Sequence, residues 1–342
     1  MRVAQLVPIV GVPSSASDSW DANLEKLLSP VPLQQTNAWG DVSRSLGWRV
    51  TRLGLSGGNA ALVLTRGHGP LRWGYVPRGP VPPTIEAVEE LIVWARSQGL
   101  AMLRVEPEAG PELGVRLRTG GFRRGQLSEP SRTLIVTLGA DEHLLGSFHS
   151  GTRHKVRKAE RLGVVVEESG DIEELERQVS ATYRRQRVFM DTSLVRAFHQ
   201  AIPTSRIYVA LHNSVPLAAI LIARHGSRAY YLAGGSNGLH RELLPNHALQ
   251  WRAMRDAYRD GCVDYDLHGI PPSRQPNHPW HGLYQFKTGF GGREVEYAGP
   301  WDIALTPWAD ALNRIANAVA TRSIRAVHRV GAAIGRSRDE GA

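Results

Sequence analysis

The sequence repeats one order of secondary-structure patterns twice, and this repetition is the feature that most constrains the fold. Each round reads as a helix, a meander of three strands, a second helix and a closing strand. The first round closes with an amphipathic helix at 83–99 and a strand at 100–108. The second closes with a helix at 246–261 and a strand at 262–270. Such a recurrence predicts a duplicated α/β unit.

The order of elements resembles the GNAT acyltransferase fold, in which an R/Q-x-x-G-x-G/A loop opens a helix and binds a pyrophosphate. The match in this chain, "RSQGLA" at 96–101, instead closes a helix, so we expect no acetyl-coenzyme A site. The predicted fold is mixed α/β (α+β) with two tandem GNAT-like domains. We place the first domain at 1–140, completed by a C-terminal helix at about 296–325, the second at 141–295, and a basic tail at 326–342 whose order stays open.

The composition narrows the partners and the location. A net charge of +9 indicates a polyanionic partner, such as a nucleic acid, an anionic lipid or a phosphorylated substrate. The single cysteine, Cys262, excludes an internal disulfide, and the scattered histidines form no metal-binding spacing, so we expect no metal and no organic cofactor. The sequence has no apolar run of about 18 residues and no signal-peptide pattern, which predicts a cytoplasmic protein.

Several sequence blocks together resemble the Fem-type (FemABX) peptidyltransferases over about residues 30–300. The most specific are "YDLHGI" at 265–270 and "GLYQFKTGFGG" at 282–292. Members of this family move an amino acid from an aminoacyl-tRNA to the stem peptide of a peptidoglycan precursor. The resemblance implies the same reaction here, with aminoacyl-tRNA and a nucleotide- or lipid-linked muropeptide as partners and no DNA. The family fold has two GNAT-like domains, and because no heptad run occurs, we expect no coiled-coil insertion.

The candidate catalytic residues are Lys287, Glu106 and Asp266. Lys287 is one of only four lysines and lies in a segment that we predict to be too rich in glycine for a helix. Its ammonium would stabilise the oxyanion formed during aminoacyl transfer, and the resemblance places it at the reaction centre or at the terminal adenosine. Without that resemblance, a surface lysine in a turn is the simpler interpretation. Glu106 and Asp266 are candidate general bases, and each could instead cap backbone amides; proton transfer by the tRNA ribose is a third route.

Other residues are expected to bind substrate. Arginines suit the diphosphate of the acceptor, and Arg185 has Arg184 and Arg187 as alternatives. Aromatic residues would line the pockets, although packing in the core is an equal or stronger expectation for them. The predicted set is Arg78, Arg185 and Arg44 for phosphate, Tyr75 and Trp39 for the same pocket, and Tyr230, Tyr265 and Phe286 for the donor.

A basic run provides a candidate surface for tRNA. It contains Arg153, Lys155, Arg157, Lys158 and Arg161, which on a helix form either a contact with acceptor-stem phosphates or an ordinary solvated face. The C-terminal segment alternates apolar residues with arginines, so it either packs on the first domain or rests on the inner membrane surface. Two rival functions remain: a tRNA-dependent peptide ligase of secondary metabolism, and a non-catalytic RNA- or membrane-binding protein.

Overall fold

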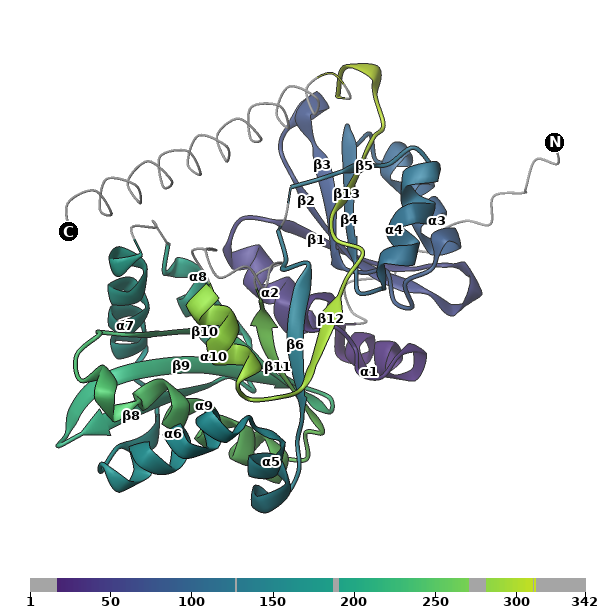
Figure 1. Ribbon diagram of the computed structural model, residues 1–342. Coiled ribbons are helices and arrows are strands. Elements are labelled where there is room, and N and C mark those ends of the chain that lie inside the picture. The colour runs from purple at the N-terminus through teal and green to yellow at the C-terminus, as the bar shows by residue number, and fades with distance from the viewer. Residues whose placement is uncertain (1–16, 127, 187–190, 271–280, 310, 312–342) are drawn as a thin grey trace, which may run out of the picture.

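The computed structural model describes residues 17–126, 128–186, 191–270, 281–309 and 311 (Figure 1). These residues form two sheets, each covered by helices, and this arrangement confirms the predicted mixed α/β fold with two GNAT-like halves. In the described part, the longest helix has 15 residues.

The first sheet has six strands, and helices α3 (Ile85–Ser97) and α4 (Pro111–Thr119) lie together on one of its faces (Figure 1). Its parallel pair is β3 with β4, flanked by antiparallel neighbours. In spatial order the strands are β1 (Arg49–Gly54), β2 (Ala60–Arg66), β3 (Trp73–Arg78), β4 (Met102–Pro107), β13 (Trp301–Ala304) and β5 (Arg123–Arg124).

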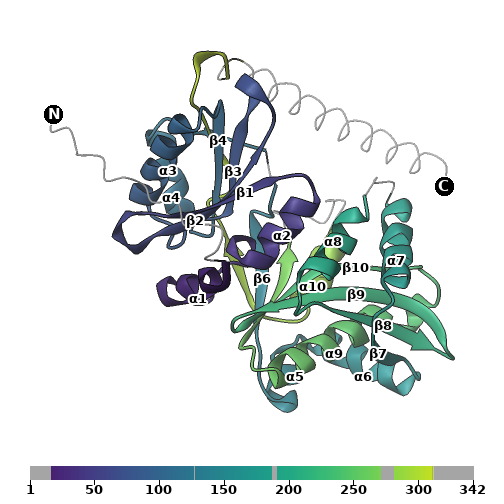
Figure 2. The same cartoon turned by 180° about the vertical axis from the view of Figure 1, so that it is seen from behind.

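The second sheet has seven strands and one parallel pair, β10 with β11. Helices α5 (Asp141–Ser147), α6 (Ser150–Arg161) and α9 (Pro245–Arg259) cover one face, and α7 (Ile172–Arg185) and α8 (Ser193–Ala201) cover the other (Figure 2). In spatial order the strands are β12 (Arg293–Glu296), β6 (Arg132–Thr137), β11 (Asp264–Gly269), β10 (Arg228–Ser236), β9 (Val215–His225), β8 (Arg206–His212) and β7 (Val165–Ser169).

The two halves exchange short strands. β6 precedes residue 140 in sequence but pairs with β11 and β12 of the second sheet, whereas β13 returns to pair with β4 of the first. We therefore propose that the domain boundary lies near residue 130, in place of the expected position near 140. The expected completion of the first domain is a strand, β13, as far as residue 304; most of the helix expected at 296–325 and the whole tail at 326–342 lie outside the described residues.

A shared apolar cluster fixes the halves against each other. Helix α1 (Ser17–Leu27) and helix α2 (Asn37–Ser45) come from the N-terminal half, and α2 packs against α8. Leu33 and Val42 are buried together with Leu175 and Val195 of the second half. Because apolar side chains from both halves are buried in one cluster, the junction between the halves is packed like the core of a domain.

The segment around Lys287 folds differently from the prediction. Residues His281–Thr288 form helix α10, so the expectation that this segment is too rich in glycine for a helix was wrong. Gly282 lies in the first turn of the helix, whereas Gly289, Gly291 and Gly292 lie after it. Gly291 and Gly292 have φ angles of 72° and 86°, a left-handed conformation that glycine adopts without steric cost. Packing of aromatic side chains holds the short helix, because the Phe286 ring lies 5.3 Å from the Phe290 ring.

Candidate functional site

The site is built where the parallel strands of the second sheet separate. β10 and β11 pair over only three residues and part after Tyr230 and Asp266. The equivalent strands of the first sheet, β3 and β4, stay paired over six residues, from Trp73 to Arg78. Among the described strands, the parallel pair of the second sheet therefore separates after three residues, which leaves an opening between β10 and β11. Helix α10 lies beside this opening (Figure 1).

Lys287 projects from α10 into this opening. Its side chain is 5% exposed, and its Nζ donates a hydrogen bond of 2.7 Å to the carbonyl of Gly269 at the end of β11. The same Nζ lies 5.5 Å from the centre of the Tyr231 ring on β10. Burial lowers the pKa of Lys287 to about 8, although the nearby Asp266 carboxylate favours the charged form. A poorly solvated ammonium therefore bridges the two separated strands.

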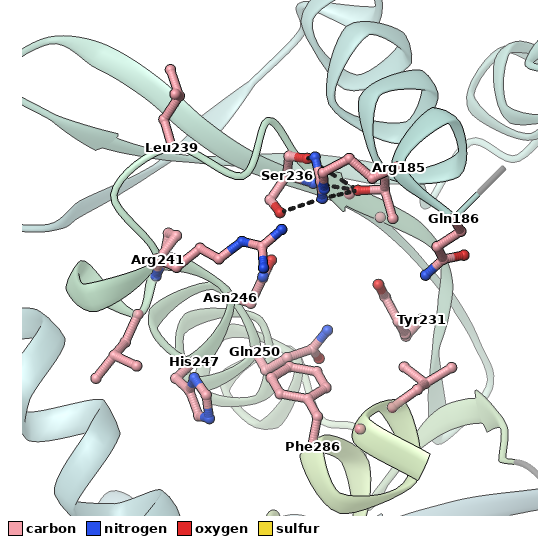
Figure 3. Close-up of a pocket in the computed structure, with 17 residues that line it drawn as sticks. Arg185, Gln186, Tyr231, Ser236, Leu239, Arg241, Asn246, His247, Gln250 and Phe286 are labelled. Carbon is pink, nitrogen blue, oxygen red and sulfur yellow. Dashed lines mark hydrogen bonds between the residues drawn. The ribbon is translucent and has the colours of Figure 1, made fainter. Parts of the chain in front are cut away.

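Tyr231, the ring beside Lys287, lines a pocket of about 470 Å³, which we call the α9 pocket (Figure 3). Its wall combines the end of α7, the end of β10, the start of α9 and one face of α10. The side chains that line the pocket include those of Arg185, Tyr231, Arg241, His247, Gln250 and Phe286. No carboxylate lines the pocket in the part of the chain that the structure describes.

Two arginines give the α9 pocket its charge. Arg185 donates a 2.5 Å hydrogen bond to the carbonyl of Ser236, and Arg241 points into the pocket from the opposite side (Figure 3). Burial, together with the positive charge of Arg241, lowers the pKa of Arg185. Gly235 allows this arrangement, because a Cβ there would lie 2.2 Å from the carbonyl oxygen of Gln178 on α7. Like charges held together without a carboxylate form a site for an anion.

The floor of the α9 pocket is aromatic and neutral. The His247 ring lies 5.1 Å from the Phe286 ring, and burial, with the charge of Lys155, lowers the pKa of His247 to about 4. The imidazole is therefore uncharged at neutral pH. A flat ring such as a nucleobase can stack on surfaces of this kind.

Gly269, which accepts the hydrogen bond from Lys287, lines a second, small space between the two sheets that we call the junction cavity. Its volume is about 10 Å³, close to the space that one water molecule needs. It is lined by Gln34, Arg78, Glu108, Pro130, Thr133, Tyr230, Asp266, His268 and Gly269. Asp266 is fixed there, because its Oδ1 accepts hydrogen bonds from the Thr133 hydroxyl and, at 2.7 Å, from the His268 amide.

Arg78 is buried beside this cavity. Its Nη2 donates to the carbonyl of Pro130 at 2.5 Å, and its guanidinium lies 4.1 Å from the centre of the Tyr297 ring. Its Nη1 is buried and has no hydrogen-bond partner among the described atoms. Arg78 therefore faces the junction cavity and does not line the α9 pocket.

Glu106 is fully buried, and its carboxylate is hydrogen-bonded. Its side chain is 0% exposed, and its Oε2 accepts a 2.5 Å hydrogen bond from the Tyr75 hydroxyl. Its Oε1 accepts from the backbone amides of Ser128 and Glu129, each at 3.2 Å. These bonds tie β4 to the segment that enters the second sheet, so Glu106 and Tyr75 hold the junction together.

The remaining predicted substrate residues are dispersed. Tyr230 lines the junction cavity and donates to the Val31 carbonyl at 3.3 Å, and Tyr265 lies beneath the α9 pocket, where it donates to Gln250 at 2.9 Å. Trp39 packs against Phe198, 5.2 Å away, outside both cavities. Arg44 is exposed at the end of α2 and pairs with Asp41. Arg187 lies outside the described residues.

The five basic residues of the run at 153–161 all lie on α6. The buried face of this helix consists of Thr152, Val156 and Ala159, so the basic side chains point toward solvent. Arg153 folds back onto the carbonyl of Phe148, whereas Arg157 and Arg161 are exposed.

The described residues contain no cluster of three or more histidine, cysteine, aspartate or glutamate side chains suited to a metal ion. A search of the same residues found no helix with the length and apolar character of a membrane span.

Comparison with known proteins shows similarity to one family over part of the chain. Residues 176–317 match the model of the FemAB family. Over 80 residues the chain is 35% identical to proteins called lipid II:glycine glycyltransferase in Staphylococcus haemolyticus (strain JCSC1435) and Staphylococcus aureus (strain USA300). The match covers 23% of this chain and 19% of each relative. These matches support a relationship of this chain to the Fem-type family, and the family model itself spans less than half of the chain.

Solved structures extend the likeness in fold to most of the chain. The crystal structure of FemX aligns with a TM-score of 0.76 at 20% identity, covering 90% of this chain and all of that one (100%). A tandem GNAT protein from the clavulanic acid biosynthesis pathway aligns with a TM-score of 0.51 at 14% identity, covering 88% and 98% of the two chains. At these identities the alignments establish the architecture of two GNAT-like halves.

Sequence reasoning missed several residues that line the two cavities. Tyr231, Arg241 and His247 line the α9 pocket, and Glu108 lines the junction cavity. Tyr231 directly follows the predicted Tyr230 and points to the opposite face of the same strand. The acidic block "VEPE" contains Glu108 as well as Glu106, and its alternation offered a signal for the second carboxylate.

The burial of Lys287 predicts a pH-dependent stability. Its pKa of about 8 in the folded protein lies below the value of about 10.4 for an unfolded lysine. Between these values the unfolded chain binds more protons, so stability should rise with pH, by up to about 1.4 kcal/mol per pH unit. The Lys287→Met variant lacks this rise. Its free energy of unfolding should therefore exceed that of the wild type by most below pH 8, and the difference should shrink toward pH 10.5.

The measurement is the free energy of unfolding in urea at several pH values for both proteins. Lys26→Met, which removes an exposed lysine, is the matched control. Parallel curves for the wild type and Lys287→Met would show that the ammonium is not held in a poorly solvated place.

Proposed function

We propose that this protein transfers an amino acid from an aminoacyl-tRNA to an amine in the stem peptide of a peptidoglycan precursor. The observation that carries the proposal is the position of Lys287, a buried ammonium between a basic pocket and an acidic cavity. The reaction joins an amine to an ester carbonyl, so a cation is needed where the oxyanion develops and a carboxylate where the amine loses its proton.

The chemistry of the ester fits the surroundings of Lys287. The amine nitrogen attacks the carbonyl carbon, the bond from that carbon to the ribose oxygen breaks, and the ribose oxygen takes a proton. Lysine has three N–H donors, and the carbonyl of Gly269 uses one of them. Among the described residues no second hydrogen bond of this Nζ is found, so we assign its remaining donors to the oxyanion. Because burial keeps water away, a charge interaction here is stronger than one at the surface.

The α9 pocket suits a phosphate-bearing substrate. Its volume of about 470 Å³ lies in the range of small-molecule sites, and Arg185 and Arg241 provide two guanidinium groups for phosphate oxygens. The aromatic rings of Phe286 and His247 provide a stacking surface. We assign the phosphate contact to Arg185 with Arg241, and not to Arg78, whose side chain is buried at the junction.

The exposed face of α6 supports a contact with tRNA. Arg157 and Arg161 lie on this face, on the helix that carries Lys155 near His247 of the α9 pocket. Contacts to phosphates position a nucleic acid without reading its sequence. The protein would then act in the cytoplasm, and at the membrane face when the acceptor is linked to a lipid.

Replacing both Arg157 and Arg161 by glutamine should weaken binding of charged and uncharged tRNA alike. The slope of log K against log salt should become shallower by about one for each lost phosphate contact. The measurement is a binding titration over a series of salt concentrations, with Arg118→Gln, an exposed arginine of α4, as the control. An unchanged salt slope would exclude α6 from the tRNA interface.

A transfer assay tests the function itself. A pool of tRNA charged with labelled amino acids is offered together with nucleotide-linked or lipid-linked muropeptides, with and without ribonuclease, and the products are weighed by mass spectrometry. The expected result is a muropeptide heavier by one amino-acid residue, which disappears after ribonuclease treatment. If tRNA binds but neither muropeptide gains mass, the acceptor is not a wall precursor, and a peptide ligase of secondary metabolism becomes the better assignment.

A further inference from the structure

Two carboxylates at the end of β4 have very different surroundings. Glu106 is completely buried, and its oxygens accept hydrogen bonds from Tyr75, Ser128 and Glu129. A carboxylate saturated in this way holds its neighbours in place and has no access to a substrate. Glu108, after Pro107, is directed instead into the junction cavity.

Glu108 is held by an ion pair and is still partly exposed. Its Oε1 accepts a 3.0 Å hydrogen bond from Nη1 of Arg228 on β10, so an ion pair reaches from the first sheet to the second. Its side chain is 18% exposed, whereas that of Arg228 is 6% exposed. Part of the Glu108 side chain is therefore in contact with solvent. Burial raises the pKa of Glu108 in spite of the charges of Arg228 and Arg78, which makes it a better proton acceptor than an exposed glutamate.

The junction cavity also contains the other groups that an amide-forming centre needs. Asp266 supplies a second carboxylate, and the buried Nη1 of Arg78 is a donor without a partner among the described atoms. Gly269, which binds the Lys287 ammonium, lines the same cavity. A volume of about 10 Å³ admits one group the size of a water molecule, which is also the size of a primary ammonium.

We propose that the junction cavity receives the amine of the acceptor and that Glu108 takes its proton. This inference rests on the proposed function and adds the acceptor subsite and its base. One proton passes from the acceptor ammonium to Glu108, and the freed nitrogen forms a bond to the ester carbonyl carbon. The bond to the ribose oxygen then breaks, and that oxygen receives the second proton from the nitrogen. Glu108 returns its proton to water.

Asp266 is less suited to this role. One of its oxygens is fixed by Thr133 and by the His268 amide, and its negative charge favours the ammonium form of Lys287. Protonation of Asp266 would remove that support during the reaction. Glu108 can accept a proton while Asp266 remains the negative counter-charge of Lys287. The two carboxylates therefore have separate roles.

The test uses two acceptors that differ in the need for a base. One is the muropeptide with its natural amine, and the other carries an aminooxy group, which is already neutral at pH 7. Glu108→Gln should lower kcat with the natural amine by about 10²-fold or more, and it should transfer to the aminooxy acceptor at close to the wild-type rate. Glu112→Gln, the same change at an exposed position in the same half, serves as the control.

Two comparisons keep the result interpretable. Glu108→Asp retains a carboxylate, so it should keep more activity with the natural amine than Glu108→Gln, and thermal unfolding shows whether each variant is folded. An equal loss with both acceptors, or no loss with either, overturns the role of Glu108 and leaves the proposed function intact. If the wild-type protein transfers to neither acceptor, the proposed function falls, and the inference falls with it.

Discussion

The ammonium of Lys287 lies between two strands that would otherwise pair, and much of the surrounding structure follows from accommodating it. A buried charge is costly unless it is paired and hydrogen-bonded. Here the carbonyl of Gly269 accepts one bond and Asp266 provides the opposite charge, while the Thr133 hydroxyl and the His268 amide fix Asp266. β11 supplies both partners: Asp266 is the last residue paired with β10, and Gly269 lies beyond that pairing, where its carbonyl is free to accept from Lys287.

The duplicated fold uses equivalent strands for two purposes. In both halves an acidic residue lies on the last strand of the parallel pair: Glu106 pairs in register with Pro77, and Asp266 with Tyr230. In the first half the strands stay together, and Glu106 binds the backbone that enters the second half. In the second half the strands separate, and Asp266 lies at the base of the opening. One half therefore has a continuous parallel pair, and the other has an opening in its parallel pair, where we propose that the reaction takes place. Glu108 and Arg228 join them.

Much of the fold could be predicted from the sequence, because hydrophobic periodicity specifies helices and strands locally. The helix, three-strand meander, second helix and closing strand of each half occur in the predicted order, although α4, α8, β12 and β13 were not predicted. The motif around Lys287 pointed to the residue at the centre of the candidate site. The helix around that lysine was missed, because aromatic packing between Phe286, Phe290 and His247 stabilises it, and local propensity does not report such contacts. The place of β6 in the second sheet was missed for a similar reason, since strand pairing is set by tertiary contacts. Arg241 lines the α9 pocket because of the path of the loop before α9, and Glu108 lines the junction cavity because one half packs on the other. Neither arrangement follows from local sequence.

The most direct test of the central claim is the rate of aminoacyl transfer in a single turnover by the Lys287→Ala variant, with charged tRNA and acceptor both saturating. If the ammonium stabilises the developing oxyanion, the rate should fall by at least about 10²-fold, while binding of both substrates and thermal unfolding show that the site is still formed. A single-turnover rate equal to that of the wild type would contradict the account, because the charge between the two cavities would then play no part in the chemistry.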